Sequence, residues 1–455
     1  MEPSLPSGIT LLDLLMTPIF LILILTAAYF IKTKYIREHA YFKYFLPGLV
    51  LKIVGAFSLC LTYMYYYKGG DTLNYFYSAD VMTHLMFHDF RTFIDIVFTG
   101  DLNPTNLSTF TVATGTPYYK FDSNSFLVVR LVTPLALLSF RSFMTASLLI
   151  ATISFTGIWK AYTVFVEHFP KLERQMALAF LFLPSVFFWG SGILKDTITL
   201  SAVGWFTYSM YHLLKGKLSN ISYIIYIIIS SYLLLRIKPY LFYALVPSSA
   251  LFALLIITNQ FKSGFIRAII FPVTLAIIGI SAYILLIQVG NEKDRGAKFS
   301  LNNVMDYAVT VQQDLKREEY KGSTFDIGSF DASFLSMASK APQAINGALF
   351  RPYIWEATNP VMLFSSLENT FLLVLSILVL YKLRLINFFR VLARDPLLLF
   401  SITFAILISF AVGISTSNFG TLVRYKIPAL PFYVATIYAS QFLYNKSRSL
   451  NPESE

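Results

Sequence analysis

Long runs of hydrophobic residues recur along this chain, and only short polar links separate most of them. A helix that crosses a bilayer needs about 17–25 mostly apolar residues, because each residue advances the helix by only about 1.5 Å. Candidate runs lie at residues 9–31, 45–67, 143–166, 176–191, 195–214, 219–235, 240–258, 267–288, 364–382, 396–415 and 426–444. We therefore predict an all-α fold: a polytopic transmembrane helical bundle of about eleven spans, forming a single transmembrane domain over 1–455.

Composition supports a membrane protein and excludes a disulfide framework. Of the 455 residues, 56% are hydrophobic and 13% are charged, whereas soluble domains carry about 25% charged residues. Cys60 is the only cysteine, so an intramolecular disulfide is excluded. The N-terminus lacks the basic region of a cleavable signal peptide, so we expect the first run to be retained.

The basic residues of the short links predict the orientation, because cytoplasmic links are enriched in lysine and arginine. The link after the first run carries four basic residues and one acid, so we place it in the cytoplasm. The stretch at 125–140 is apolar but short, and it contains Arg130 and Pro134. If this stretch lies in the outer interface instead of crossing, the basic links that follow fall inside. We therefore predict the N-terminus outside, the C-terminus inside and an interfacial helix at 125–140.

Two larger polar segments, 68–142 and 289–363, both face outside in this topology, and we expect interfacial helices in them. The tail at 445–455 is expected to be disordered. The net charge of +11 comes from residues spread over the links, so we expect no nucleic-acid partner and take the lipid bilayer as the partner. The cytoplasmic links are too short to build a site for ATP or a nucleotide-sugar.

The first outer segment opens with two glycines followed by Asp71. The glycines permit a tight turn, after which a helix is expected to start with Asp71 at its cap. Asp71, Tyr75 and Ala79 are four residues apart and would share one helix face. A carboxylate there could act as general base on a hydroxyl; the alternative is that Asp71 only caps the helix.

A second candidate site lies in the turn between two adjacent runs, from Pro184 to Thr197. Its glycines allow close approach of the backbone, and Lys195 and Asp196 follow at the outer surface. A lysine at this place could hold a phosphate as a point charge. The alternative is a snorkelling lysine beside a capping aspartate.

Further basic residues are predicted on the outer side. Arg236 and Lys238 form the only basic cluster in a short outer link, which violates the charge rule and favours binding of an anion such as a lipid phosphate. The alternatives are misplaced span boundaries or contact with bulk headgroups. Arg424 and Lys426 precede the last run, and Arg351 precedes the ninth; for these the alternatives are interfacial anchors or surface ion pairs.

Asp80, His84 and His88 are also spaced four apart and could present two histidines to a transition metal. Further histidine or cysteine ligands are lacking nearby, so we predict no metal site. We interpret these residues as the polar face of an interfacial helix. The opposite face would carry Met82, Leu85, Met86 and Phe90.

The order of these features resembles the GT-C-fold glycosyltransferases, which use polyprenyl-phosphate-linked sugars, and the related polysaccharide polymerases of the O-antigen polymerase and EpsG kind. Their first outer loop typically reads Asp-(Asp/Glu)-x-x-Tyr-x-x-x-Ala; Asp71, Tyr75 and Ala79 match, but Thr72 replaces the second acid. The segment 424–431 is similar to their Arg-Tyr-x-x-Pro-x-x-Pro, and 184–196 looks like their Pro…Ser-Gly…Asp turn. Taken in order, the match covers about half of the chain, although each motif is short, and the extra run at 9–31 departs from the family pattern.

The resemblance implies a membrane glycosyltransferase or polysaccharide polymerase on the outer face of a bacterial plasma membrane. Asp71 would be the catalytic base, and Lys195, Arg236, Lys238 and Arg424 would bind the departing lipid phosphate. A divalent cation could assist. Two other classes stay open, a transporter of lipid-linked sugar or polysaccharide and a non-catalytic scaffold of a surface assembly. The sequence identifies neither the sugar nor the acceptor, the lipid carrier or any protein partner.

Overall fold

In the computed structural model, the described residues fold almost entirely into helices, which confirms the all-α prediction for this part of the chain. Within the described residues, six helices are long and apolar enough to cross a membrane: Leu11–Tyr35, Ala40–Tyr67, Phe143–His168, Pro239–Ile257, Pro360–Leu383 and Pro396–Ser415. Two shorter apolar helices are Ser123–Leu138 and Ile221–Ile237. The structure describes residues 4–100, 102–111, 114–216, 220–260, 324–328, 336, 339–416 and 418–450. The predicted span 267–288, much of the segment 289–363 and the end of the predicted tail lie outside these residues.

The chain forms two compact units. The first comprises residues 1–164, 186–208 and 225–238, and the second comprises 165–185, 209–224 and 239–455. The first unit begins with helices α1 Leu11–Tyr35, α2 Phe45–Leu61, α3 Asp71–His88, α4 Phe90–Thr99, α5 Pro104–Ser108 and α6 Ser123–Leu138. Two short helical segments, η1 Ala40–Tyr44 and η2 Thr62–Tyr67, lie directly before and after α2. The unit also contains most of α7 Phe143–His168, α9 Pro184–Trp189, α10 Lys195–Leu214 and α11 Ile221–Ile237.

The second unit holds the ends of α7 and α10 together with most of the C-terminal half. Its remaining elements are η3 Pro170–Leu172, α8 Glu173–Leu181, α12 Pro239–Gln260, α16 Ala341–Phe350, η6 Ile354–Glu356, α17 Pro360–Leu383, α18 Leu385–Leu392, α19 Pro396–Ser415, α20 Phe419–Tyr425 and α21 Leu430–Leu450. Aromatic rings from several of these helices, among them Phe400, Phe404 and Phe432, pack in its core. Helix α21 continues into the segment predicted as a disordered tail.

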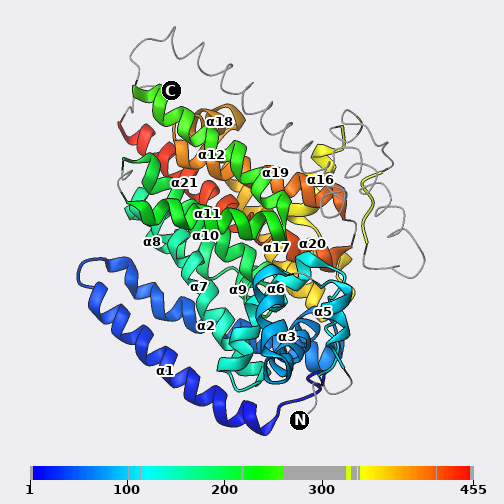
Figure 1. Cartoon of the computed structure of the whole chain (residues 1–455). Helices are drawn as coiled ribbons and strands as arrows, with labels where there is room; N and C mark the ends of the chain where they lie inside the picture. The colour runs from blue at the N-terminus through cyan, green and yellow to red at the C-terminus, as the bar shows by residue number, and fades with distance from the viewer. Residues whose placement is uncertain are drawn as a thin grey trace. The chain divides into compact units, whose positions relative to one another are not determined.

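In the first unit, α1 and α2 run side by side, and contacts at one end place the starts of α1 and α7 together (Figure 1). Asp13, in the first turn of α1, accepts hydrogen bonds from the Ser142 hydroxyl at 2.6 Å and the Met144 amide at 3.1 Å. In η2, which follows α2, the Tyr65 hydroxyl accepts the Ile9 amide at 3.3 Å. The chain therefore leaves η2 and enters α7 at the same end of the unit. This is the arrangement that a non-crossing helix at 125–140 requires.

Helix α3 is a core helix rather than the predicted interfacial one. Met82 and Leu85 are fully buried, and α3 packs along α6. Asp80 is buried as well, and the Arg141 guanidinium donates to both of its carboxylate oxygens, at 2.5 and 3.0 Å. Because Arg141 compensates this charge, Asp80 can lie inside the protein, whereas His84 is half-buried and His88 is exposed. The periodicity of the sequence could not show this partner.

The predicted span at 176–191 is broken in the structure into α8 and α9. The break falls just before Pro184, which cannot donate a backbone hydrogen bond and disfavours helix in the preceding residue. In the first unit, α9 and the turn after it approach α2 closely. A Cβ atom at Gly55 would lie 2.0 Å from the Phe187 carbonyl oxygen, and the Lys52 ammonium donates to the Gly190 carbonyl. This turn is therefore fixed against α2.

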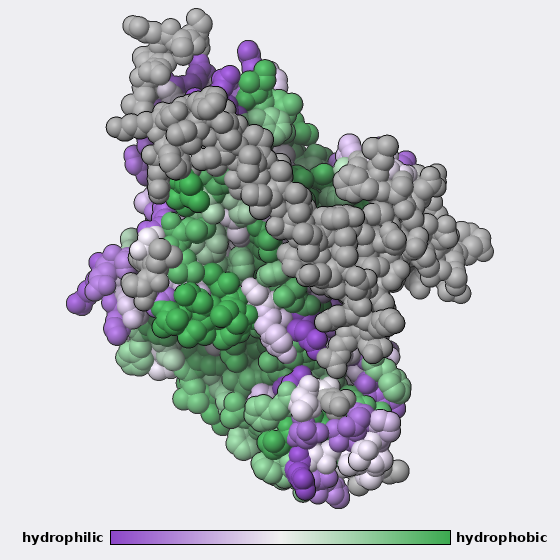
Figure 2. All heavy atoms as spheres, turned by 45° about the horizontal axis from the view of Figure 1, so that its top comes forward, coloured by the Kyte–Doolittle hydropathy of each residue, from purple (hydrophilic) through white to green (hydrophobic). Residues whose placement is uncertain are grey.

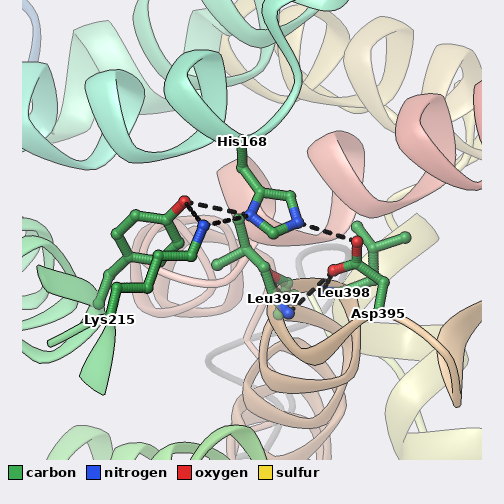
Figure 3. Close-up of polar contacts among 7 residues, drawn as sticks. His168, Lys215, Asp395, Leu397 and Leu398 are labelled. Carbon is green, nitrogen blue, oxygen red and sulfur yellow. Dashed lines mark hydrogen bonds and ion pairs between the residues drawn. The ribbon is translucent and has the colours of Figure 1, made fainter. Parts of the chain in front are cut away.

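A polar cluster in the second unit joins the ends of α7 and α10 to the start of α19 (Figure 3). The His168 ring contacts the Asp395 carboxylate through Nε2 at 2.9 Å and the Tyr211 hydroxyl through Nδ1 at 3.1 Å. The Lys215 ammonium donates to the same hydroxyl at 2.6 Å. The sequence predicts that the links at these three helix ends share one side of the membrane, and the cluster brings those ends together.

Hydrophobic side chains are exposed over large parts of the surface. On the face drawn in Figure 2, the coloured residues are mostly hydrophobic. Exposed hydrophobic side chains lie along the length of α1, α11 and α17 and include Ile22, Phe30, Ile228 and Leu378. Monomeric soluble proteins rarely expose contiguous apolar patches of this kind, because water makes them costly. With its six long apolar helices, the chain has the features of a multi-pass membrane protein.

Candidate functional site

The candidate site in the first unit begins at the turn between η2 and α3. Lys68 and Gly70 have positive φ values of 52° and 109°, which reverse the chain before Asp71. Helix α3 begins at Asp71, as predicted, but Gly70 occupies the cap position. The Asp71 carboxylate accepts a hydrogen bond from the Tyr119 hydroxyl at 3.2 Å. Asp71 therefore contacts a second part of the outer segment and does not act as the helix cap.

Tyr75 links Asp71 to the start of α6. Its ring stacks on Tyr119, with the ring centroids 4.5 Å apart, and its buried hydroxyl donates to the Ser125 hydroxyl at 3.4 Å. Ser125 in turn donates to the Asp122 carboxylate at 2.5 Å. Asp122 is also the N-cap of α6, since it accepts the amides of the first helical turn. The aromatic pair thus connects one carboxylate of the segment to another.

Lys195 completes this network from α10. Its ammonium lies 3.5 Å from the Asp122 carboxylate, at the surface of the unit. Three predicted site residues, Asp71, Tyr75 and Lys195, are therefore joined through Tyr119, Ser125 and Asp122. We call these six residues the outer network. Its hydrogen bonds, ring stacking and ion pair connect the Asp71 carboxylate to the Lys195 ammonium through one chain of contacts.

The contacts of the network shift the pKa values of Tyr119 and Asp122. Burial and the neighbouring Asp71 charge raise the pKa of the Tyr119 hydroxyl, so it stays a hydrogen-bond donor. Burial raises the pKa of Asp122, but the hydrogen bond from Ser125 and the Lys195 charge outweigh it and leave the pKa below its ordinary value. The hydrogen bond from Ser125 and the charge of Lys195 therefore both favour the ionised form of Asp122.

The lowered pKa of Asp122 predicts a change in acid stability. The folded state binds fewer protons than the unfolded state here, so this contribution is present above the ordinary pKa and is lost as pH falls through the folded pKa. We expect Asp122→Asn to flatten the rise of melting temperature with pH between about pH 3 and 5. Thermal melts of the two proteins in the same detergent would check this; equal slopes would contradict it.

Next to the network, Asp196 and Lys238 form a buried ion pair. The Lys238 ammonium donates to the Asp196 carboxylate at 2.5 Å, and the two side chains are 6% and 1% exposed. The pair joins the start of α10 to the residue after α11. Arg236 lies in the last turn of α11 and is half-buried. The sequence predicted Arg236 and Lys238 as one basic cluster, and of these two residues Lys238 is the one enclosed within the protein.

The other predicted site residues belong to the second unit. Arg351 makes a bidentate ion pair with Glu356, and its guanidinium lies 4.9 Å from the centre of the Phe325 ring. Arg424 is half-buried in the last turn of α20.

Lys426 is fully buried in the second unit. Its ammonium donates to the Asn369 side-chain oxygen at 2.6 Å and to the Leu349 carbonyl at 3.3 Å. Glu368, which directly precedes Asn369 in α17, is buried too and accepts the Ser185 amide at 2.7 Å. Lys426 therefore connects the end of α16 to α17. Ionisable groups enclosed at this depth are costly and need such partners.

Tyr119, Asp122 and Ser125 are not among the site residues predicted from the sequence. An aspartate three residues before a serine and ahead of an apolar run is a capping signal that could have indicated Asp122. Tyr119 lies in a turn without periodicity, so no local signal indicates its contact with Asp71. Among the described residues, no three His, Cys, Asp or Glu side chains gather as metal ligands would. The chain matches no protein-family model, no curated protein and no solved structure.

Proposed function

We propose that the chain is a membrane glycosyltransferase or polysaccharide polymerase that uses a polyprenyl-linked sugar on the outer face of a bacterial plasma membrane. The observation that carries the proposal is the outer network. It joins Asp71 to Lys195, although these residues come from separate helices. A carboxylate, stacked aromatic rings and an ammonium group are the chemistry that sugar hydroxyls, sugar rings and a phosphate need.

Exposed aromatic residues beside the network support carbohydrate binding. Tyr118 is 64% exposed and Phe121 is 85% exposed, and they flank Tyr119 and Asp122 in the sequence. Aromatic side chains are enriched in binding surfaces, and large exposed ones therefore favour such a surface here. In this site they could stack against sugar rings while Asp71 binds a hydroxyl.

The transfer would proceed by displacement at the anomeric carbon of the donor. An acceptor hydroxyl oxygen forms a bond to that carbon, and its proton moves to the Asp71 carboxylate. The bond between the anomeric carbon and the phosphate oxygen breaks, and its electron pair leaves with the polyprenyl phosphate. Lys195 would stabilise the negative charge that develops on this leaving group, as preorganised cations do in other transfer reactions.

A complementation experiment tests the proposal. In a strain that lacks the native copy, we expect Asp71→Asn to lower surface polysaccharide by at least about a hundredfold, because it removes the proton acceptor. Lys195→Met should lower it less. The matched control is Asp95→Asn, which changes an exposed carboxylate of the same segment outside the network. Equal amounts of each protein in the membrane are verified by immunoblot.

The outcome also separates the rival functions. Unchanged polysaccharide in Asp71→Asn cells would exclude Asp71 as the base. If the variant instead accumulates finished polymer or lipid-linked sugar inside the cell, the chain is a transporter. A purified protein in liposomes with a labelled polyprenyl-phosphate sugar then shows whether transfer itself is lost.

A further inference from the structure

Helix α4, in the first outer segment, presents three different faces. Phe93 and Ile96 point into the protein and are buried. Phe90, Ile94 and Phe98 follow one another at four-residue spacing and are 63%, 36% and 76% exposed. Because successive residues are turned by about 100°, the exposed polar residues Arg91, Asp95 and Thr99 form a separate stripe beside them. We call Phe90, Ile94 and Phe98 the apolar ridge.

The apolar ridge would be costly in water. Burying one large apolar side chain is worth about 1.5–3 kcal/mol, and Phe87, just before α4, adds another ring that is 76% exposed. Single exposed hydrophobic residues are normal, but an aligned ridge on one helix face marks an interaction surface. Helix α4 has 10 residues, about half of what a membrane crossing needs, so it cannot span.

Contacts at both ends fix the orientation of α4. Asp89 caps its N-terminus by accepting the Thr92 amide at 3.1 Å. At the C-terminus, the Arg130 guanidinium donates to the carbonyls of Val97 and Phe98 at 2.6 and 2.7 Å. Gly100 follows with φ +70°, and a Cβ atom there would lie 2.4 Å from Arg130. The ridge is therefore held out from the protein by a rigid support.

The position of α4 in the chain indicates what covers the ridge. The segment that contains it starts and ends at one end of the first unit, next to the ends of two helices apt to cross a membrane. Tyr65, Tyr66 and Tyr67 are exposed where the chain leaves the first of these, as is typical of a membrane–water interface. A helix at that level has acyl chains on one side and water on the other.

We infer that α4 lies in the plane of the outer membrane interface, with the apolar ridge inserted among lipid chains and the stripe of Arg91, Asp95 and Thr99 facing water. The three faces correspond to protein, lipid and water, which is the pattern of an interfacial helix. Such an anchor would fix the height of the outer network above the bilayer. The inference rests on α4 alone and does not depend on the proposed enzymatic activity.

Spin labelling tests this placement. The full chain carries one cysteine, the buried Cys60, so Cys60→Ala gives a background for single-cysteine variants. Nitroxide labels at positions 90, 94 and 98 are compared with labels at 91, 95 and 99 of the same helix, in protein reconstituted into liposomes. Power saturation then measures collision with oxygen, which concentrates in lipid, and with a water-soluble nickel chelate.

We expect the ratio of oxygen to nickel collisions to be severalfold higher at the three ridge positions than at the three polar positions, alternating with the helical period. Access of nickel to both sets would place α4 in water and overturn the inference. Low access of both reagents at the ridge would show that protein covers it, either a partner or a second copy, and would overturn it too. Comparing six positions within one helix guards against a single misfolded variant.

Discussion

Replacing Lys238 by methionine should lower the free energy of unfolding by about 3–5 kcal/mol, the largest effect that we expect from a single change in the first unit. The substitution keeps the length of the side chain but removes the ammonium that lies 2.5 Å from the Asp196 carboxylate. Asp196 is 1% exposed, so water cannot take the place of the lost partner. The consequence is measured as a fall in melting temperature and in yield of folded protein in detergent.

Two controls separate the ion pair from simple packing. Lys195→Met removes the neighbouring lysine, whose partner Asp122 is half-exposed, so the cost should stay below about 1 kcal/mol. The double variant Asp196→Leu/Lys238→Met removes both charges and should recover most of the stability lost by Lys238→Met. If Lys238→Met melts together with Lys195→Met, the buried pair is not the contact that holds α10 to the residue after α11.

The six long apolar helices among the described residues correspond to six of the eleven predicted runs, because a lipid-facing helix must be apolar over its whole length. The run at 9–31 corresponds to α1, and 364–382 corresponds to α17. Boundaries were less predictable. Helix α21 starts at Leu430 instead of 426, because Pro428 disfavours helix just before it, and Lys426 in the preceding turn donates to Asn369 and Leu349. Such a partner leaves no trace in the hydropathy pattern.

The candidate site could be predicted in part. The helical spacing of Asp71 and Tyr75 and the position of Lys195 after a glycine-rich turn indicated residues that the structure joins in one network. The residues that join them could not be derived, because Tyr119 contacts Asp71 across 48 positions of chain. Helix α4 shows the same limit, since its exposed ridge becomes evident only when the buried face is known.

Replacing Asp395 should have a large effect in the second unit, because this one carboxylate has two roles (Figure 3). It caps α19 by accepting the Leu397 and Leu398 amides at 2.9 and 3.1 Å, and it contacts His168 at 2.9 Å. Loss of a cap costs about 0.5–2 kcal/mol, and loss of a hydrogen bond to a charged group costs about 1.5–3 kcal/mol. We therefore expect Asp395→Ala to lower the free energy of unfolding by about 2–4 kcal/mol.

Serine at position 395 separates the two roles, since its hydroxyl can cap α19 but is too short to reach the imidazole as the carboxylate does. Asp395→Ser should melt between the wild type and Asp395→Ala. In a His168→Phe background, which removes both ring nitrogens, the difference between Asp395→Ser and aspartate should largely disappear, because their distinguishing contact is gone. A serine variant that melts like the wild type would show that the histidine contact contributes nothing. One that melts like the alanine variant would show that capping contributes nothing, so that His168 alone carries the attachment of α19 to α7.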